Sequence, residues 1–208
     1  MREWHRYYSA KRIGQQWQQL DLVGRFHRGG EILEIGPYLG LVTACLVNAG
    51  YDLTTLDIAE KQFRVPEARH IVADIRNLDP NTIAGFDTIL CCEMLEHLPW
   101  QETDRVLRNL ARPGRTMIIS VPYEGWQVFV QLYANRHTAR QMFQWRKLRA
   151  LRRFPVEGDA PDVHKWEVGY SGHSLAAWER KLVAAGWTIL HRQFTAPTRS
   201  VFHVLRSS

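Results

Sequence analysis

The sequence predicts an α/β protein with a mostly parallel sheet and helices on both of its faces. Strand-like and helix-like segments alternate five times between residues 31 and 121, which is typical of parallel strands joined by crossovers. The first segment, 31–36, is a short, largely apolar run, as expected for a strand covered on both faces. Glycine or proline marks several boundaries, as at Gly50 and Pro122, where helices and strands commonly end.

Length and composition fit one folded domain, residues 1–208. Of the 208 residues, 45% are hydrophobic and 23% are charged, which are ordinary values for a globular protein. No apolar run approaches the roughly 20 residues that a membrane-spanning helix needs. Residues 1–12 also lack the apolar core of a signal peptide. We therefore expect a cytoplasmic protein.

Net charge and cysteine content indicate which kinds of partner and ligand the protein could bind. A net charge of +6 is compatible with an anionic partner such as nucleic acid or a membrane surface, but no nucleic-acid-binding module is recognisable in the sequence. The three cysteines, Cys45, Cys91 and Cys92, predict no disulfide framework. No Cys/His spacing resembles a zinc site, so the sequence predicts no metal site.

Residues 1–28 are predicted to be an N-terminal helical lid. From Ile13 onward the apolar residues follow a helical spacing. They are Ile13, Trp17, Leu20 and Val23. Aromatic residues precede this stripe, namely Trp4, Tyr7 and Tyr8. The aromatics fit closure over a ligand, whereas the stripe fits a helix that simply packs on the sheet, and the sequence leaves both interpretations open.

The other elements follow in order along the chain. Strands are expected at 31–36, 52–57, 69–73, 86–92, 115–121, 187–194 and 200–205. Helices are expected at 41–48, 101–111 and 174–185. The last two strands are predicted to pair antiparallel at an edge of the sheet.

Residues 123–170 interrupt this alternation and are predicted to form a helical insert after the fifth strand. One apolar face would contain Trp126, Phe129, Val130 and Tyr133, which fall at helical spacing. Basic residues follow at Arg146, Lys147, Arg149, Arg152 and Arg153. The pattern fits a cover over a substrate pocket, and it also fits peripheral contact with an anionic membrane through residues 126–153.

The most informative stretch is the strand–turn–helix–strand unit at residues 31–57. Gly36 and Gly40 let the backbone pass close to a ligand. Asp57 follows at the end of the next strand, where its carboxylate can accept hydrogen bonds from both ribose hydroxyls. The turn reads G-P-Y-L-G and lacks the G-x-G-x-x-G spacing of dinucleotide sites. This difference favours S-adenosylmethionine over a nicotinamide dinucleotide.

Two later segments extend the predicted cofactor site. Asp74 follows the third strand, where it can accept from an adenine amino group while Ile75 lies against the ring; alternatively, Asp74 caps the following turn. Glu93 and Met94 follow the fourth strand and are expected beside the glycine turn. His97 lies on the same loop, either as a base or as a histidine bonded to backbone.

These segments together resemble the class I S-adenosylmethionine-dependent methyltransferases, and among them the small bacterial and archaeal members of the type 11/type 23 methyltransferase domain group. The resemblance rests on EIGPYLG, LTTLDI, VADIRNL, FDTILCCEMLEHLP and RPGRTMIISVP, in this order, and is strong over residues 30–122. It implies a Rossmann-like sheet of seven strands with the last strand antiparallel. It also implies that the cofactor is bordered by Glu34, Gly36, Pro37, Tyr38, Gly40, Asp57, Ile58, Asp74, Ile75, Glu93 and Met94.

The predicted activity is methyl transfer from S-adenosylmethionine to a small-molecule oxygen or nitrogen. Such a transfer needs an aligned nucleophile and exclusion of water, and a general base helps when the nucleophile is a hydroxyl or a protonated amine. The candidate catalytic residues are His97 and His164, the latter beside Trp166 and Glu167 in the segment HKWE.

Other functions remain open at the level of sequence. The related family usually has a small residue at the position of Tyr38, so a methyltransferase-like binding module without catalysis is one alternative. A lipid-like, quinone-like or nucleic-acid acceptor is another, although the Asn-Pro-Pro-aromatic motif of amino-directed nucleic-acid methyltransferases is absent after the fourth strand. A nicotinamide-linked oxidoreductase is disfavoured by the glycine spacing.

Overall fold

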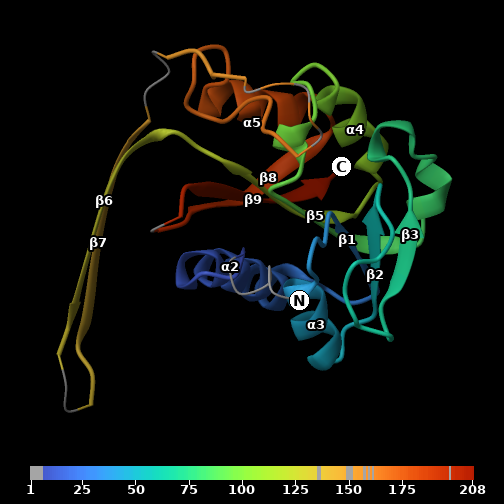
Figure 1. Cartoon of the computed structure of the whole chain (residues 1–208), viewed down its shortest axis with the longest axis horizontal. Coiled ribbons are helices and arrows are strands. Elements are labelled where there is room, and N and C mark those ends of the chain that lie inside the picture. Colours follow the sequence, from blue (N-terminus) through green and yellow to red (C-terminus); the bar gives the residue numbers. More distant parts are fainter. Residues whose placement is uncertain are drawn as a thin grey trace.

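One seven-stranded sheet forms the centre of the protein, in the order β3-β2-β1-β4-β5-β9-β8 (Figure 1). The computed structural model describes residues 7–134, 137–148, 152–156, 158, 160, 162–196 and 198–208. Five neighbouring strands pair in parallel: β1 (Glu31–Ile35), β2 (Leu53–Asp57), β3 (Arg69–Val72), β4 (Phe86–Cys92) and β5 (Thr116–Pro122). The last strand, β9 (Ser200–Ser207), pairs antiparallel with both β5 and β8 (Trp187–Phe194). The predicted sheet and its antiparallel last strand are confirmed.

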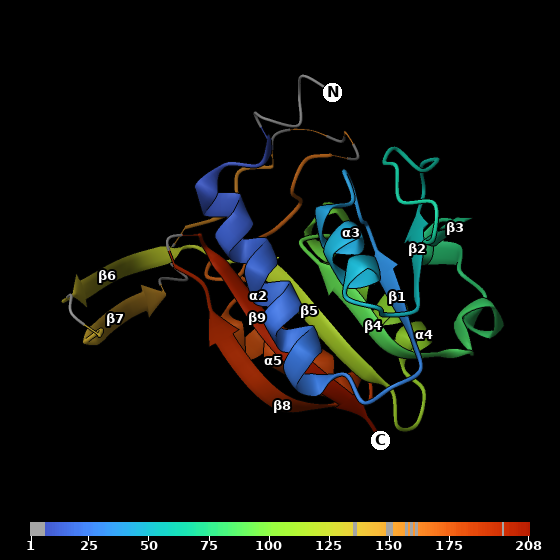
Figure 2. The same cartoon turned by 90° about the horizontal axis from the view of Figure 1, so that it is seen from below.

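Helices cover both faces of this sheet (Figures 1 and 2). α2 (Ala10–Phe26) and α3 (Leu41–Asn48) lie on one face, and α4 (Thr103–Leu110) and α5 (Leu175–Ala184) lie on the other. Three short 3-10 helices lie in the connections: η1 (Ile75–Asn77), η2 (Pro80–Ile83) and η3 (Leu95–His97).

Neighbouring residues on a strand divide the core into two layers, because their side chains point to opposite faces. Ile32, Leu90 and Ile118 pack with Leu22, Val23 and Leu46 from α2 and α3. The residues that follow them, Leu33, Cys91 and Ile119, pack with Leu107, Trp178 and Leu182 from α4 and α5. Both faces of the parallel strands are therefore buried, which explains why these strands read as continuous apolar runs.

The α2 helix packs on the sheet, but with a different face from the predicted one. Its buried residues are Gln19, Leu22 and Val23, whereas Ile13 and Trp17 are 48% and 67% exposed. The predicted burial of the first half of the apolar stripe is therefore wrong: the first half of α2 contacts the sheet through Gln15, which donates to Ser200 Oγ on β9 at 2.8 Å, while Ile13 and Trp17 stay exposed. Ser9 caps the helix by accepting from Arg12 N at 3.3 Å. Trp4 lies outside the described residues, and the lid role of residues 1–28 stays a prediction.

The predicted helical insert is wrong: the chain after β5 forms an antiparallel hairpin that extends away from the body (Figure 1). Its strands are β6 (Gly125–Tyr133) and β7 (Arg140–Leu148). Large residues occupy nearly every position of 126–133, so they match a helical spacing by coincidence, while the β-branched and aromatic side chains favour a strand. Cross-strand pairs such as Val128–Trp145 and Val130–Phe143 support the hairpin.

This hairpin arm, residues 125–148, presents one apolar face. Trp126, Val128, Val130 and Leu132 alternate along β6 and are 44–64% exposed. Arg149 lies outside the described residues, as do some other positions of 126–153, and membrane contact through this range stays a prediction. None of the helices in the described parts of the chain is long and apolar enough to cross a bilayer, and the cytoplasmic location also stays a prediction.

After the hairpin the chain returns along the carboxyl end of β5. Val168 N donates to Pro122 O at 3.0 Å, and Glu124 N donates to Val168 O at 2.6 Å. Gly169 has a φ of +100°, and a β-carbon there would lie 2.2 Å from Glu124 O, so this close approach requires glycine. The return segment, residues 162–170, is thereby held beside the end of the parallel strands.

Candidate functional site

Both glycines of the turn after β1 lie so close to neighbouring side chains that a β-carbon would crowd them. Gly36 and Gly40 have φ values of +70° and +71°. A β-carbon on Gly36 would lie 3.2 Å from Met94 Cγ, and one on Gly40 would lie 2.4 Å from Phe63 Cγ. The turn therefore contacts the loop after β4 on one side and the loop after β2 on the other. The structure thus brings Gly36, Gly40 and Met94 together as predicted from the sequence.

Glu34 is buried on β1, directly before this turn. Its side chain is 5% exposed and accepts a hydrogen bond from Thr43 Oγ1 at 2.6 Å. Burial raises the pKa of Glu34 to about 7, and the Thr43 hydrogen bond opposes that rise. The carboxyl group is therefore close to the point where it gains or loses a proton at neutral pH.

Tyr38 turns its ring toward the N-terminal aromatic residues. It has a φ of +47°, unusual for a residue with a side chain, and its ring centroid lies 4.5 Å from that of Tyr7. The Arg12 guanidinium lies over the Tyr7 ring, with its central carbon 4.2 Å from the ring centroid. Tyr8 accepts from Leu41 N at 3.2 Å, at the start of α3. Residues 7–12 thus lie against the glycine turn and the start of α3, which is compatible with the lid interpretation.

Asp57 lies at the end of β2 beside a cavity of about 90 Å³. Its Oδ1 accepts from Ala59 N at 3.0 Å. Ile58, the next residue, is 64% exposed. The cavity joins the glycine turn to the loop after β2, and its lining residues are Pro37, Tyr38, Asp57, Ala59, Glu60, Lys61, Gln62, Phe63 and His70.

Asp74 caps η1, which is the alternative that the sequence left open. It accepts from Arg76 N at 2.9 Å and pairs with the Arg76 guanidinium at 2.7–3.0 Å. The Arg76 hydrogen bonds hold the pKa of Asp74 below its usual range. Ile75 is 7% exposed and packs in the core. A structural role thus accounts for these two residues, and their predicted contact with adenine stays a prediction.

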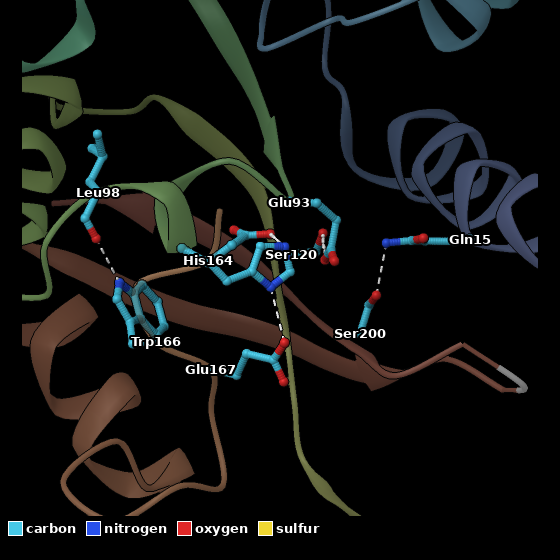
Figure 3. Close-up of polar contacts among 9 residues, drawn as sticks. Gln15, Glu93, Leu98, Ser120, His164, Trp166, Glu167 and Ser200 are labelled. Carbon is cyan, nitrogen blue, oxygen red and sulfur yellow. Dashed lines mark hydrogen bonds and ion pairs between the residues drawn. The ribbon is translucent and has the colours of Figure 1, made fainter. Parts of the chain in front are cut away.

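Glu93 links the end of β4 to β5 and stands near α2 (Figure 3). It has a φ of +53° and accepts from Ser120 Oγ at 2.8 Å. Nearby, Gln15 Nε2 donates to Ser200 Oγ at 2.8 Å. Burial raises the pKa of Glu93 to about 7, partly offset by hydrogen bonds from Ser120 and Ser200. Four separate elements therefore meet around this carboxyl group.

His97 and His164 are brought together although they are far apart in the sequence. Their ring centroids lie 5.0 Å apart in a T-shaped arrangement. His164 Nδ1 lies 2.9 Å from Glu167 Oε1 (Figure 3). Burial, together with the nearby His164, lowers the pKa of His97. The two candidate catalytic residues therefore form one cluster beside the loop after β4.

The return segment is anchored to this loop by backbone and aromatic contacts. Lys165 N donates to Glu96 O at 2.7 Å, and Trp166 Nε1 donates to Leu98 O at 3.0 Å (Figure 3). The Trp166 ring is fully buried, with its centroid 4.7 Å from that of Trp100 and 5.4 Å from that of Trp178. These contacts fix the position of His164.

Several residues of the site were not identified from the sequence. They are Gln15, Thr43, Phe63, Glu96 and Ser120. Glu96 could have been identified from the sequence, because it is next to His97 and is a charged residue in a largely apolar stretch. The other four come from separate elements, and nothing in their local sequence marks them.

A larger cavity of about 350 Å³ lies at the opposite end of the sheet. Its lining includes Gly30, Asp87 and Thr116, which lie at the amino ends of β1, β4 and β5. Ligands of open parallel sheets bind beyond the carboxyl ends of the strands. We therefore place the functional site at the carboxyl edge, where the smaller cavity and the titratable groups lie.

Comparison with known proteins gives one family and several relatives. The model of a type 23 family, described as a methyltransferase domain, matches residues 1–191. The ubiquinone biosynthesis O-methyltransferase of Bordetella avium is 26% identical over 132 residues, covering 58% of this chain and 49% of that protein. The enzyme of the same name from Albidiferax ferrireducens is 28% identical over 103 residues, covering 44% and 41%. The chain thus spans about half the length of the curated relatives it matches.

Solved structures share the fold over nearly the whole chain. A glycopeptide N-methyltransferase, MtfA, complexed with S-adenosyl-L-methionine, matches with a TM-score of 0.62 and 14% identity, covering 93% of this chain and 94% of that one. The Burkholderia thailandensis 1,6-didemethyltoxoflavin-N1-methyltransferase, with S-adenosylhomocysteine bound, matches with a TM-score of 0.60 and 17% identity, covering 99% and 84%. At these identities the likeness shows the fold alone.

Proposed function

This chain belongs to the type 23 methyltransferase domain family, and from that membership we propose that it transfers a methyl group from S-adenosylmethionine to an oxygen or nitrogen of a small molecule. One observation carries the proposal. The glycine turn after β1, the acid at the end of β2 and the Glu93 carboxyl group all lie at the carboxyl edge of the sheet, where such folds bind nucleoside cofactors.

The residues present fit this cofactor. Gly36 and Gly40 have the positive φ that this turn requires, and their nearest neighbours, Met94 and Phe63, come from the two loops that we propose to border the cofactor. Asp57 borders a cavity beside the turn and is proposed to bind the ribose hydroxyls. Ile58, strongly exposed without a ligand, is proposed to pack on the same nucleoside.

The remaining cofactor contacts are proposed on both sides of the turn. Glu34, Pro37 and Tyr38 would border the cofactor along the turn, and Glu93 with Met94 would bind its amino-acid end. Asp74 and Ile75 would meet the adenine. The Tyr38 ring packs on the Tyr7 ring. Because it points at another side chain of the protein, it leaves the cofactor uncrowded, which supports cofactor binding.

The acceptor is proposed to bind beside His97 and His164. The bound cofactor supplies a methyl carbon that is already activated by its sulfonium. The chain must then align the acceptor atom and exclude water. The anchored return segment supports both tasks, because Trp166 holds His164 against the loop after β4. An imidazole in this place can also take a proton from an acceptor hydroxyl or amine.

The named relatives support oxygen and nitrogen acceptors alike. The curated relatives are O-methyltransferases of ubiquinone biosynthesis, and the structural neighbours include N-methyltransferases. A lipid-like or quinone-like acceptor is the second candidate, since the hairpin arm carries the exposed apolar side chains of Trp126, Val130 and Leu132, which suit an apolar partner.

Calorimetric titration with S-adenosylmethionine, S-adenosylhomocysteine and NAD tests the proposal. We expect both sulfur ligands to bind and NAD to fail, since the turn lacks the dinucleotide spacing. Turnover is then measured on panels of phenol, quinol and amine acceptors. Absence of binding by both sulfur ligands would falsify the proposal. Binding without turnover on any acceptor would favour a binding module over an enzyme.

A further inference from the structure

Glu96 is a fully buried carboxyl group without a hydrogen-bond partner. Its exposed fraction is 0%, and neither Oε1 nor Oε2 meets a donor among the described residues. Leaving a buried polar group unsatisfied costs about 1–3 kcal/mol, and more for a charged group. A ligand from outside the chain would satisfy this side chain.

His164 presents a ring nitrogen to Glu96. Its Nδ1 is taken by Glu167 Oε1 at 2.9 Å, while its Nε2 lies 3.9 Å from Glu96 Oε1, which is too far for a hydrogen bond. A carboxylate on one nitrogen of a histidine, with the other nitrogen facing an ion, is the usual arrangement around metal-binding histidines.

His97 completes a group of three donors. Its Nδ1 is buried and has no partner among the described residues. One ligand atom from each of Glu96, His97 and His164 lies within 4.8 Å of the other two. Ligand atoms about 2.1 Å from a tetrahedral ion are about 3.4 Å apart, so side-chain movements of about 1 Å would bring all three to bonding distance.

From these contacts we propose that Glu96, His97 and His164 bind a divalent transition-metal cation. Two imidazoles and one carboxylate suit Zn²⁺, Fe²⁺ and similar ions, whereas Mg²⁺ and Ca²⁺ prefer oxygen ligands. Three protein ligands leave a coordination position open for water or another oxygen. Glu167 orients His164 through its Nδ1.

An ion pair between Glu96 and a protonated His164 accounts for less of the geometry. The atoms are 3.9 Å apart, and the pair leaves His97 Nδ1 and the second Glu96 oxygen without partners. A cation satisfies all three side chains at once. The sequence predicted no metal site because only two of the donors are adjacent, and His164 joins them through the return segment.

Cation binding has one consequence for chemistry, which rests on the proposed function. An acceptor hydroxyl in the open position would lose its proton more readily, as metal-bound water does. The two imidazoles would then act as ligands instead of bases, and oxygen acceptors would be favoured over nitrogen. The binding itself does not depend on methyl transfer and can be measured without it.

Titration of the metal-free 208-residue chain with Co²⁺ tests the proposal. Bound Co²⁺ is followed by its visible absorption, and calorimetry with Zn²⁺ gives the stoichiometry. We expect one ion of either metal per chain and a higher unfolding temperature with the ion present, since a ligand that binds only the folded state stabilises it.

Glu96→Gln keeps the side-chain shape and removes the ligand carboxylate. We expect this variant to fold and to bind Co²⁺ at least about 100-fold more weakly than the wild type. His173→Gln is the matched control, because His173 Nδ1 is likewise buried without a partner but its ring packs on Trp100 and Trp166. It should bind Co²⁺ as the wild type does.

Two results would overturn the proposal: no stoichiometric Co²⁺ or Zn²⁺ binding by the wild type, or wild-type affinity in Glu96→Gln. Titration with S-adenosylmethionine is a separate measurement. Intact Co²⁺ binding with no cofactor binding would therefore count against the proposed function and leave the metal site standing.

Discussion

The two halves of the site are built in different ways. The proposed cofactor half lies mainly on one continuous strand–turn–helix–strand unit, from Glu34 to Asp57, with further proposed contacts after β4. The proposed acceptor half joins Glu96 and His97, also after β4, to His164, which arrives on the return segment. Local backbone geometry fixes the first half, whereas tertiary contacts fix the second. Changes in one half should therefore leave the other half working.

The largest effect is expected from His164→Gln, which tests the independence of the acceptor half. Loss of this imidazole, proposed as a base or as a ligand of the bound cation, should lower turnover by about 10³-fold, within the range found for removal of an acid–base group. The affinity for S-adenosylmethionine, measured by calorimetry, should stay unchanged. His191→Gln, on β8, is the control and should keep full turnover. An equal loss of cofactor affinity in His164→Gln would show that the halves are coupled.

Glu34→Gln should remove a pH dependence that belongs to the cofactor half. Because burial raises the pKa of Glu34 from 4.5 to about 7, the folded state holds a proton that the unfolded state has lost. This contribution to the free energy of unfolding is complete below about pH 4.5 and is lost as the pH rises to about 7, a total of about 3 kcal/mol.

Urea unfolding between pH 4.5 and 8 measures this slope in the wild type and in the variant. Glu60→Gln, which changes an exposed carboxyl group, is the control and should keep the wild-type slope. If the slope in Glu34→Gln equals that of the wild type, Glu34 is not the group that titrates.

Asp57→Ala should weaken S-adenosylmethionine binding by about 100-fold, the loss expected from two hydrogen bonds to a charged group. Turnover at saturating cofactor should change little, because the acceptor half is intact. Asp52→Ala is a matched control, since Asp52 is exposed just before the same strand. Wild-type cofactor affinity in Asp57→Ala would remove the ribose assignment.

The smallest effect is expected from comparing two glycine substitutions. Gly40 and Gly50 both have positive φ, +71° and +87°, but only Gly40 faces a neighbour, the Phe63 ring. Gly50→Ala should cost about 1–2 kcal/mol in unfolding free energy from backbone strain alone. Gly40→Ala should cost about 1–3 kcal/mol more from crowding and should also weaken cofactor binding. Equal losses in both variants would mean that Phe63 moves aside freely.

The cofactor half could be predicted from sequence because its information is local. A strand, two glycines and an acid at the next strand end define it within residues 31–57, and the structure places them as expected. The alternation of segments predicted a parallel sheet covered on both faces, and the family resemblance implied its seven strands and its antiparallel last strand. The His97–His164 pair was proposed from each residue separately, and its contact depends on the buried Trp166 and on Gly169, which no periodicity reveals.

The hairpin arm was mispredicted for a related reason. In β6 apolar residues stand at every second position, Trp126, Val128, Val130 and Leu132, but Phe129 and Tyr133 are also large and apolar, so the sequence fits a period of 3.6 as well as a period of two. In residues 126–133 nearly every position is large. Only pairing with residues 140–148, a contact beyond the range of a local pattern, decides the structure.

The path of the chain from β5 through the hairpin arm to the return segment has a consequence for how relatives of this protein can diverge. Residues 123–170 leave β5 and come back to it, through Tyr123 and Val168, at a single paired position. That stretch carries both the hairpin arm and His164. A replacement between these two points would exchange His164 and the projecting surface together, while Glu96, His97 and the unit at residues 31–57 are inherited unchanged. The range of substrates in such relatives would change through replacement of this one segment.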